Sequence, residues 1–188
     1  MVKKVLLIIA HPKEKSLNNF LAKRYQELCI EAGHEIKVID LYKDKFNPLY
    51  HSHLDNDPLV KVYQDQILWA EHLVFVHPVW WYDMPAMLKG FFDKVFASKF
   101  AFKYVDSKPV GLLQGRTVQF IRTFGGPKIY TYFIGAANVS AVKHAIVGFC
   151  GMKWLGNYDL FNTNTKEMSE KKAIEFVESN FKKAIKKI

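Results

Sequence analysis

Five segments of the chain combine β-branched, aliphatic and aromatic residues, and two of them, residues 2–10 and 73–76, are nearly continuous apolar runs. Strands that are buried on both faces of a parallel sheet require such runs, because neither face of the sheet meets water. We therefore predict strands at residues 2–10, 35–41, 73–76, 117–124 and 152–158.

Between the runs, apolar residues recur every three or four positions, which is the spacing of a helix with one buried side. Ser16 is a suitable N-cap for the first of these segments, and Gly33 ends it. Asp57 and Pro58 start another with a capping carboxylate and a proline at the first helical position. We predict helices at residues 17–32, 58–70, 85–96, 139–149 and 167–187.

This alternation predicts a doubly wound α/β sandwich, because parallel strands need right-handed crossover helices. No repeat or linker divides the chain, and 188 residues suit one domain, so we expect residues 1–188 to form a single unit. In such sheets the ligand binds beyond the carboxyl ends of the strands. Function is therefore expected in three loops, residues 11–18, 77–84 and 124–131.

Composition adds a basic surface to this picture. The chain has 27 basic and 18 acidic residues, a net charge of +9, which favours anionic partners such as phosphate-bearing small molecules. Much of the excess lies in a lysine cluster near the C-terminus, typical of a solvated helix face. Nucleic-acid motifs, a membrane span and a signal-peptide core are all missing from the sequence, so we expect a cytoplasmic protein without a nucleic-acid partner.

Cysteine and histidine spacing gives no metal site. Cys29 and Cys150 stand far apart and outside any Cys-x-x-Cys pattern, and we expect both to be core residues. His51 and His53 are two imidazoles without a third ligand nearby, which is too few for a zinc site. We predict no metal.

The first loop has the character of a phosphate site. Ser16, Leu17 and Asn18 occupy the first turn of a helix that follows a strand, where free N–H groups and the helix dipole favour an anion. Side chains of Ser16, Asn18 and His11 can add donors. The alternative is that Ser16 only caps the helix and His11 is a solvated turn residue. The loop lacks the Rossmann and Walker glycine patterns.

The second loop is the most informative segment of the chain. It begins Pro78, Val79, Trp80, Trp81, Tyr82, and adjacent aromatic side chains at the mouth of a sheet are costly to expose. Such rings suit a planar ligand, with loop N–H groups reaching its heteroatoms. The alternative is a hydrophobic cap on the sheet.

The third loop combines glycines with a phenol. After Thr123 and Phe124, the pair Gly125 and Gly126 allows a close approach of the backbone, and Tyr130 offers a hydroxyl donor. A simple glycine turn is the alternative.

Motifs in all three loops and in the segments that follow them resemble one family. They are Ala10-His11-Pro12, Ser16-Leu17-Asn18, Asp40-Leu41-Tyr42, Phe46-Asn47-Pro48, HPVWWYDMPAMLKGFFDKVFASKFAFKY at 77–104 and Thr123-Phe124-Gly125-Gly126-Pro127. Together they cover most of the chain in order. The chain is similar to the flavodoxin-like NAD(P)H:quinone oxidoreductases, the group that contains DT-diaphorase, the modulators of drug activity and the potassium-efflux ancillary proteins.

The resemblance implies a three-layer sandwich around a five-stranded parallel sheet of order 2-1-3-4-5, with helices on both faces. It implies FMN as cofactor, with FAD as the second choice because the long C-terminal extension of the larger FAD-binding members is missing. The implied flavin-binding residues are His11, Ser16, Leu17, Asn18, Pro78, Val79, Trp80, Trp81, Tyr82, Thr123, Phe124, Gly125, Gly126 and Tyr130.

The resemblance also implies the reaction. NAD(P)H reduces the flavin, and a quinone or related aromatic acceptor, azo and nitro compounds included, then reoxidises it in a ping-pong cycle. Tyr130 would be catalytic at the N1/O2 edge of the flavin. Trp81, Phe102, Tyr104 and Tyr130 would form the substrate pocket, with Phe102 and Tyr104 acting on the partner subunit of a homodimer.

Two departures and two alternatives accompany this interpretation. Residues 131–137 contain no histidine to match a catalytic histidine of the family, so solvent or Tyr130 alone would deliver the proton. Phe124 replaces a small polar residue. One alternative function is a one-electron carrier of flavodoxin type, against which the net charge and the Trp80-Trp81 loop both argue. The other is a regulatory flavoprotein subunit that binds a membrane potassium-efflux protein.

Overall fold

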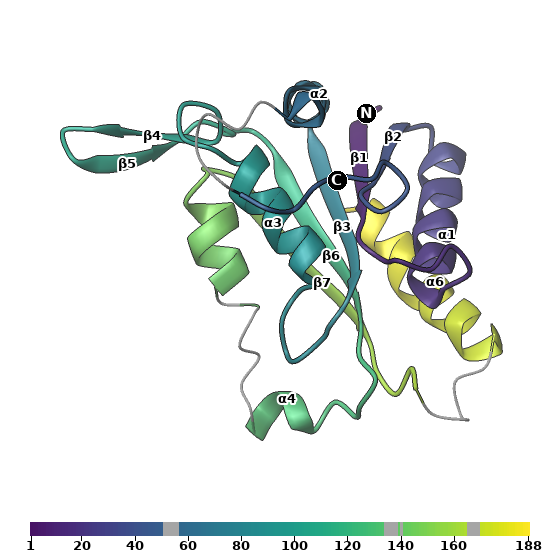
Figure 1. Ribbon diagram of the computed structural model, residues 1–188. Coiled ribbons are helices and arrows are strands. Elements are labelled where there is room, and N and C mark those ends of the chain that lie inside the picture. Colours follow the sequence, from purple (N-terminus) through teal and green to yellow (C-terminus); the bar gives the residue numbers. More distant parts are fainter. Residues whose placement is uncertain (51–56, 134–138, 140, 165–169) are drawn as a thin grey trace.

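The computed structural model describes residues 1–50, 57–133, 139, 141–164 and 170–188. A central sheet lies between two layers of helices (Figure 1). All of its strands are parallel and follow the order β2-β1-β3-β6-β7, which confirms the predicted order 2-1-3-4-5. The strands are β1 (Lys4–Ile9), β2 (Glu35–Asp40), β3 (His72–Pro78), β6 (Thr117–Thr123) and β7 (Lys153–Leu160).

The helices cover both faces of the sheet, as expected. They are α1 (Leu17–Glu31), α2 (Pro58–Trp69), α3 (Ala86–Val95), α4 (Tyr130–Phe133), η1 (Ala141–Gly148) and α6 (Glu170–Ile185). Helices α1 and α6 pack on one face, and α2, α3 and η1 pack on the other (Figure 1). In the part of the chain described, no helix combines the length and apolar character that crossing a membrane requires.

The buried strands explain why the apolar runs were recognisable. Every residue of β3 is buried, because helices cover it on both sides. Phe75 packs on Phe91, Phe92 and Phe120 on the α3 side, while Val74 and Val76 belong to the core under α1. Burying a side chain of this size contributes about 1.5–3 kcal/mol each to stability.

A hairpin was missed in the sequence. Strands β4 (Phe102–Val105) and β5 (Lys108–Gly111) pair antiparallel and project from the body as an arm (Figure 1). The segment carries charges and a proline and has little apolar alternation, because most of its side chains are exposed. With no buried face, it has no hydrophobic pattern to detect.

Two helix predictions differ in detail. The segment predicted as an α-helix at 139–149 contains a π-helix, η1, in which Phe149 N–H donates to the His144 carbonyl five residues back. Apolar spacing does not distinguish the two helix types. The start of the helix predicted at 167–187 and the His51 and His53 pair lie outside the described residues.

Candidate active site

The loops after β3 and β6 meet at the carboxyl edge of the sheet, at the bottom of Figure 1. There they enclose a cavity of about 190 Å³. Its walls are Val79, Trp81, Tyr82, Phe124, Gly125, Gly126, Pro127, Tyr130 and Thr131. The structure thus brings together most of the residues that the sequence indicated in the second and third loops.

An aromatic turn forms one wall of this cavity. Trp80 and Asp83 exchange two backbone hydrogen bonds of 2.9 and 3.0 Å, so Trp81 and Tyr82 form a two-residue turn. Both have positive φ, 52° and 62°, a region that bulky side chains rarely adopt. Trp81 is 98% exposed, so the strained turn presents an aromatic ring to solvent.

The glycine loop forms the opposite wall, and its glycines serve packing inside the protein. A Cβ on Gly125 would lie 2.5 Å from the Asn164 side chain, and one on Gly126 would lie 3.3 Å from the Tyr130 ring. The loop after β7 holds this segment in place, because Thr163 N–H donates to the Phe124 carbonyl at 2.9 Å.

The loop at 161–164 is a supporting element that sequence reasoning missed. Phe161 stacks on Phe124 with ring centres 4.7 Å apart, and Asn162 N–H donates to the Gly126 carbonyl at 3.0 Å. Its residues have no distinctive composition. Only their place at the end of the neighbouring strand β7 could have pointed to them.

The first loop ends in a capped helix with free donors. Ser16 is the N-cap of α1, and its Oγ accepts from Asn19 N–H at 3.2 Å. Within the described chain, several backbone N–H groups at this edge of the sheet have no hydrogen-bond acceptor. They belong to Ser16, Leu17, Asn18, Trp81, Tyr82, Gly125 and Gly126.

Asn18 and Thr123 contact each other inside the protein. The Asn18 side chain is buried, and its Nδ2 donates to Thr123 Oγ1 at 3.0 Å. The Asn18 amide thus ties α1 to β6, while the expected phosphate contact of its side chain stays a prediction.

His11 links the first two loops. Its ring lies 6.3 Å from the Trp80 ring, and its Nδ1 lies 3.1 Å from the backbone nitrogen and 3.3 Å from the carbonyl oxygen of Lys13. Partial burial lowers the pKa of His11, and the backbone contact with Lys13 opposes that effect.

The residues present fit a flavin mononucleotide. The free N–H groups at the start of α1 can bind its phosphate, as helix N-termini do. The free N–H groups of Trp81, Tyr82, Gly125 and Gly126 can meet the polar edge of its ring system, and the aromatic turn supplies a stacking surface.

A match to a family model agrees with this geometry. The model for the flavodoxin-like fold matches residues 3–184. An NAD(P)H oxidoreductase of Haemophilus influenzae, itself described as uncharacterized, is 30% identical over 158 residues, covering 79% of this chain and 78% of its own. The chain belongs to the flavodoxin-like NAD(P)H:quinone oxidoreductase family.

Other members and solved structures extend this comparison. Mouse ribosyldihydronicotinamide dehydrogenase [quinone] is 26% identical over 206 residues, covering 92% of this chain and 87% of its own. Smu.1420 of Streptococcus mutans has a TM-score of 0.83 at 28% identity, with 98% and 100% of the two chains covered. An FMN-dependent NADH-azoreductase of Bacillus anthracis, solved with FMN, has a TM-score of 0.77 at 21% identity, covering 99% of each chain.

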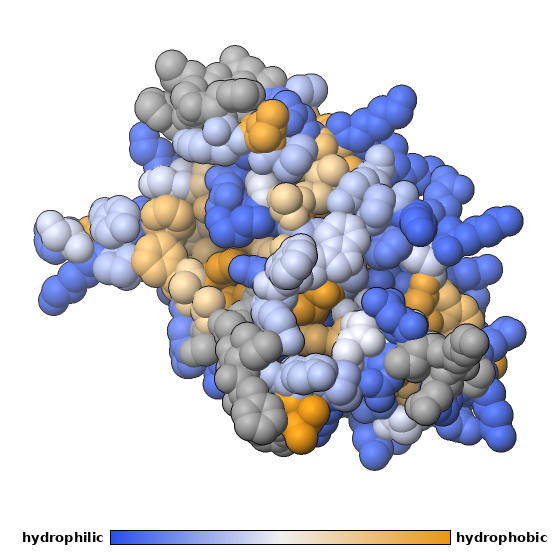
Figure 2. Space-filling view, turned by 60° about the horizontal axis from the view of Figure 1, so that its bottom comes forward, coloured by the Kyte–Doolittle hydropathy of each residue, from blue (hydrophilic) through white to orange (hydrophobic). Residues whose placement is uncertain are grey.

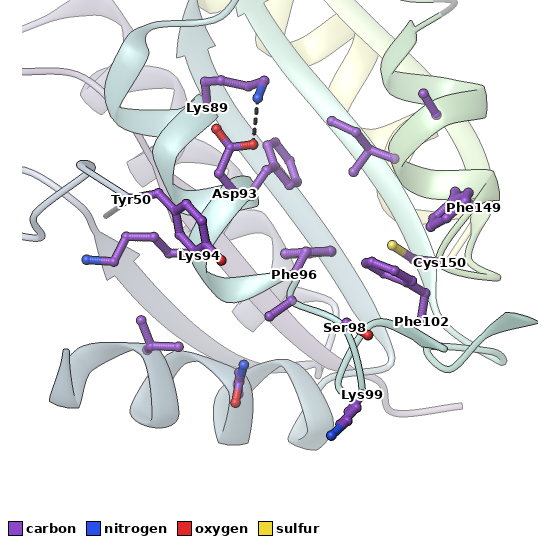
Figure 3. Close-up of a pocket in the computed structure, with 16 residues that line it drawn as sticks. Tyr50, Lys89, Asp93, Lys94, Phe96, Ser98, Lys99, Phe102, Phe149 and Cys150 are labelled. Carbon is purple, nitrogen blue, oxygen red and sulfur yellow. Dashed lines mark hydrogen bonds and ion pairs between the residues drawn. The ribbon is translucent and has the colours of Figure 1, made fainter. Parts of the chain in front are cut away.

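A second and larger cleft has a volume of about 970 Å³ (Figure 3). None of the described residues that line it belongs to the loops at 11–18, 77–84 and 124–131. It lies between α2, α3 and η1 and includes Phe96, Phe102 and Phe149 among its walls. The ammonium of Lys89, at its edge, is paired with Asp93 of the same helix. The carboxyl-edge cavity is smaller, but it has the free N–H donors and aromatic rings that a flavin requires.

Phe102 and Tyr104 do not reach the carboxyl-edge cavity of their own chain. Phe102 lines the large cleft, and Tyr104 lies further along the arm, 62% exposed. Hydrophobic surface gathers where the arm joins the body (Figure 2). A contribution of these two residues to a substrate pocket therefore requires a second subunit.

Proposed function

We propose that this protein is an FMN-dependent NAD(P)H:quinone oxidoreductase. The observation that carries the proposal is the row of free backbone N–H groups at the carboxyl edge, next to an exposed aromatic turn. The names of relatives in two kingdoms support the reaction, and the FMN complex of a similar fold supports the cofactor.

The residues at the edge divide the work of binding. The backbone N–H groups of Leu17 and Asn18, with the imidazole of His11, would hold the phosphate, and FAD would place its first phosphate there too. The bound flavin would accept a hydride from NAD(P)H and give it to the acceptor. Tyr130, which lines the cavity, would donate a hydrogen bond to the ring edge where negative charge develops.

Trp81 would form the outer wall for the exchanging substrates. Its ring is almost fully exposed, so it can stack on a nicotinamide or a quinone without closing the cavity. We therefore propose that donor and acceptor use one position in turn. Initial-rate measurements test this, because parallel double-reciprocal lines are expected and intersecting lines would contradict a ping-pong cycle.

We also propose a homodimer that buries the arm and the large cleft. An isolated two-stranded hairpin is marginally stable in water, and the arm exposes Tyr104 and Val105. The partner's pocket would gain Phe102 and Tyr104 as a wall. Light scattering tests the mass in solution, and a monomer at micromolar concentration would contradict the proposal.

The remaining expectations follow from this function. Residues 1–188 would act as one flavin-binding domain, since the loops of the site come from β1, β3 and β6 across the sheet. Use of NAD(P)H, the reductant of the cytoplasm, is our reason to propose a cytoplasmic location.

Cofactor and activity can be tested on the purified protein. We expect a yellow preparation whose heat-released cofactor elutes as FMN, and NAD(P)H oxidation that benzoquinone stimulates. Stopped-flow mixing with NADPH should bleach the flavin in one two-electron step. A protein that binds flavin but is not reduced by NADH or NADPH would instead be an electron carrier, and a colourless protein that takes up no FMN would refute the proposal.

A further inference from the structure

Three polar side chains form a row across the sheet just before the site loops begin. His77 of β3 lies in register with Arg122 of β6, which lies in register with Asp159 of β7. They share the face of the sheet that carries Phe75 and Phe120, because side chains two residues apart on a strand point the same way. The rest of that face is apolar along β3 and β6.

Arg122 and Asp159 form a closely fitted ion pair in this row. Arg122 is 6% exposed, and its Nε and Nη2 donate to the two carboxylate oxygens of Asp159 at 2.8 and 2.7 Å. Asn157 Nδ2 adds a third hydrogen bond to Asp159 at 2.6 Å. Further N–H groups of the guanidinium have no acceptor within the described part of the chain.

Stability is a poor explanation for this pair. Removing two charges from water costs free energy that their attraction seldom recovers in full, and apolar residues at such positions are often as stabilising. Phe120 precedes Arg122 on β6, and Trp154 precedes Asp159 on β7. Their rings stack 5.2 Å apart, so an apolar pair can pack between the same two strands. A charged pair at the edge of the site therefore suggests an effect on the site.

Phe124 connects Arg122 to the cavity. The guanidinium carbon lies 5.2 Å from the centre of the Phe124 ring, and Phe124 lines the cavity beside Gly125 and Gly126. A flavin ring bound against this wall would be separated from the guanidinium by the Phe124 ring, and charges this close to a partly buried site interact appreciably.

We propose that Arg122 and Asp159 set the reduction potential of the flavin bound in this cavity. Arg122 favours the reduced flavin, which carries a negative charge near neutral pH, and Asp159 limits that effect. The inference rests on the proposed function. Both residues act through the electric field at the ring, and neither touches the reacting atoms.

Removing each of the two charges in turn should shift the midpoint potential of the flavin in opposite directions. We expect Arg122→Gln to lower the midpoint potential of bound FMN and Asp159→Asn to raise it, measured by spectroelectrochemical titration at pH 7. The double variant should return toward the wild-type potential. Shifts in the same direction for both single variants, or none in either, would overturn the inference, because a merely loosened loop changes both variants alike.

Arg116 provides a matched control. It precedes β6 at the opposite edge of the sheet, about 20 Å along the strand from Arg122, and donates to the Ile67 carbonyl at 2.9 Å. Arg116→Gln removes the same charge and should leave the potential unchanged. A shift as large as that of Arg122→Gln would mean that net charge alone matters, and would also overturn the inference.

A conservative variant covers the case in which Asp159→Asn does not fold. Arg122→Lys keeps the charge but loses the two-point contact with Asp159. Its flavin potential should therefore stay close to the wild-type value, whereas that of Arg122→Gln should fall. Equal potentials in the two Arg122 variants would refute the inference. A wild-type protein that takes up no flavin refutes the proposed function as well. Flavin-loaded variants with unchanged potentials refute this inference alone.

Discussion

Two turns in this protein share a backbone shape but differ in sequence. Trp81 and Tyr82 in the site, and Asp106 and Ser107 at the tip of the arm, are two-residue turns with positive φ at both positions. Small polar residues tolerate that conformation, whereas large aromatic residues pay a strain of about 1–3 kcal/mol each.

The difference indicates what selects each turn. At the arm, local chemistry and conformation agree, so the turn needs no further explanation. In the site they disagree, which supports our proposal that the aromatic rings of Trp81 and Tyr82 serve the ligand. The site turn also follows a buried histidine, His77, while residues 102–111 of the arm contain none.

Lowering the pH should destabilise the folded protein through His77, which precedes the site turn. Burial lowers the pKa of this imidazole from its ordinary 6.5 to about 4, and its Nδ1 donates to the Pro78 carbonyl at 2.9 Å. The unfolded chain then binds more protons, so stability is lost as the pH falls from 6.5 to 4. The loss attributable to this residue approaches about 3 kcal/mol.

Urea unfolding between pH 4 and 7 measures that loss. His77→Asn keeps a donor near the position of Nδ1 but does not titrate, so its stability should fall less steeply with acid. Part of the slope should remain, because burial lowers the pKa of His72 to about 3. Identical slopes in the two proteins would show that His77 is not responsible.

Giving the site turn a compatible sequence should separate stability from function. Trp81→Asn with Tyr82→Gly supplies the residues that this turn prefers, and should raise the free energy of unfolding by about 2 kcal/mol. The stacking surface is lost, so FMN retention and kcat/KM for benzoquinone should fall about tenfold. Unchanged flavin content and rates would mean that the rings do not bind the ligand.

A glycine substitution in the arm turn should have a smaller effect on stability and little effect on activity. Ser107→Gly relieves a positive φ of 62° at a small residue, and should stabilise the protein by less than about 1 kcal/mol. Thermal unfolding and NAD(P)H oxidation measure the two quantities. A gain as large as that of the site variant would remove the contrast between the turns.

The smallest effect is expected across the cavity from the site turn. Tyr130→Phe removes one hydroxyl donor from a half-exposed side chain and should lower kcat about threefold while FMN stays bound, since a hydrogen bond of a partly exposed group contributes about 0.5–1 kcal/mol. Stopped-flow reduction and flavin content give the two readouts. An unaltered rate would exclude Tyr130 from the reaction.

The fold was largely predictable from the chain, and the site only in outline. Residues 73–76 are apolar throughout because helices cover both faces of β3, so this strand can be recognised from the sequence alone. The arm has no such apolar run, because most of its side chains are exposed. The loop at 161–164 was also missed, since its residues matter only through contacts with Phe124 and Gly126.

The sequence by itself determined the alternating strands and helices and the loops of the candidate site, because periodic burial and helix caps are local properties, whereas the strand order was predicted only from the resemblance to a family. The tertiary structure decided that Asn18 binds Thr123, that Gly125 makes room for Asn164, and that Arg122 pairs with Asp159 beneath the cavity. Each of these joins positions that are distant in the chain. Their energies come from burial and hydrogen-bond geometry, which exist only once the sheet has formed.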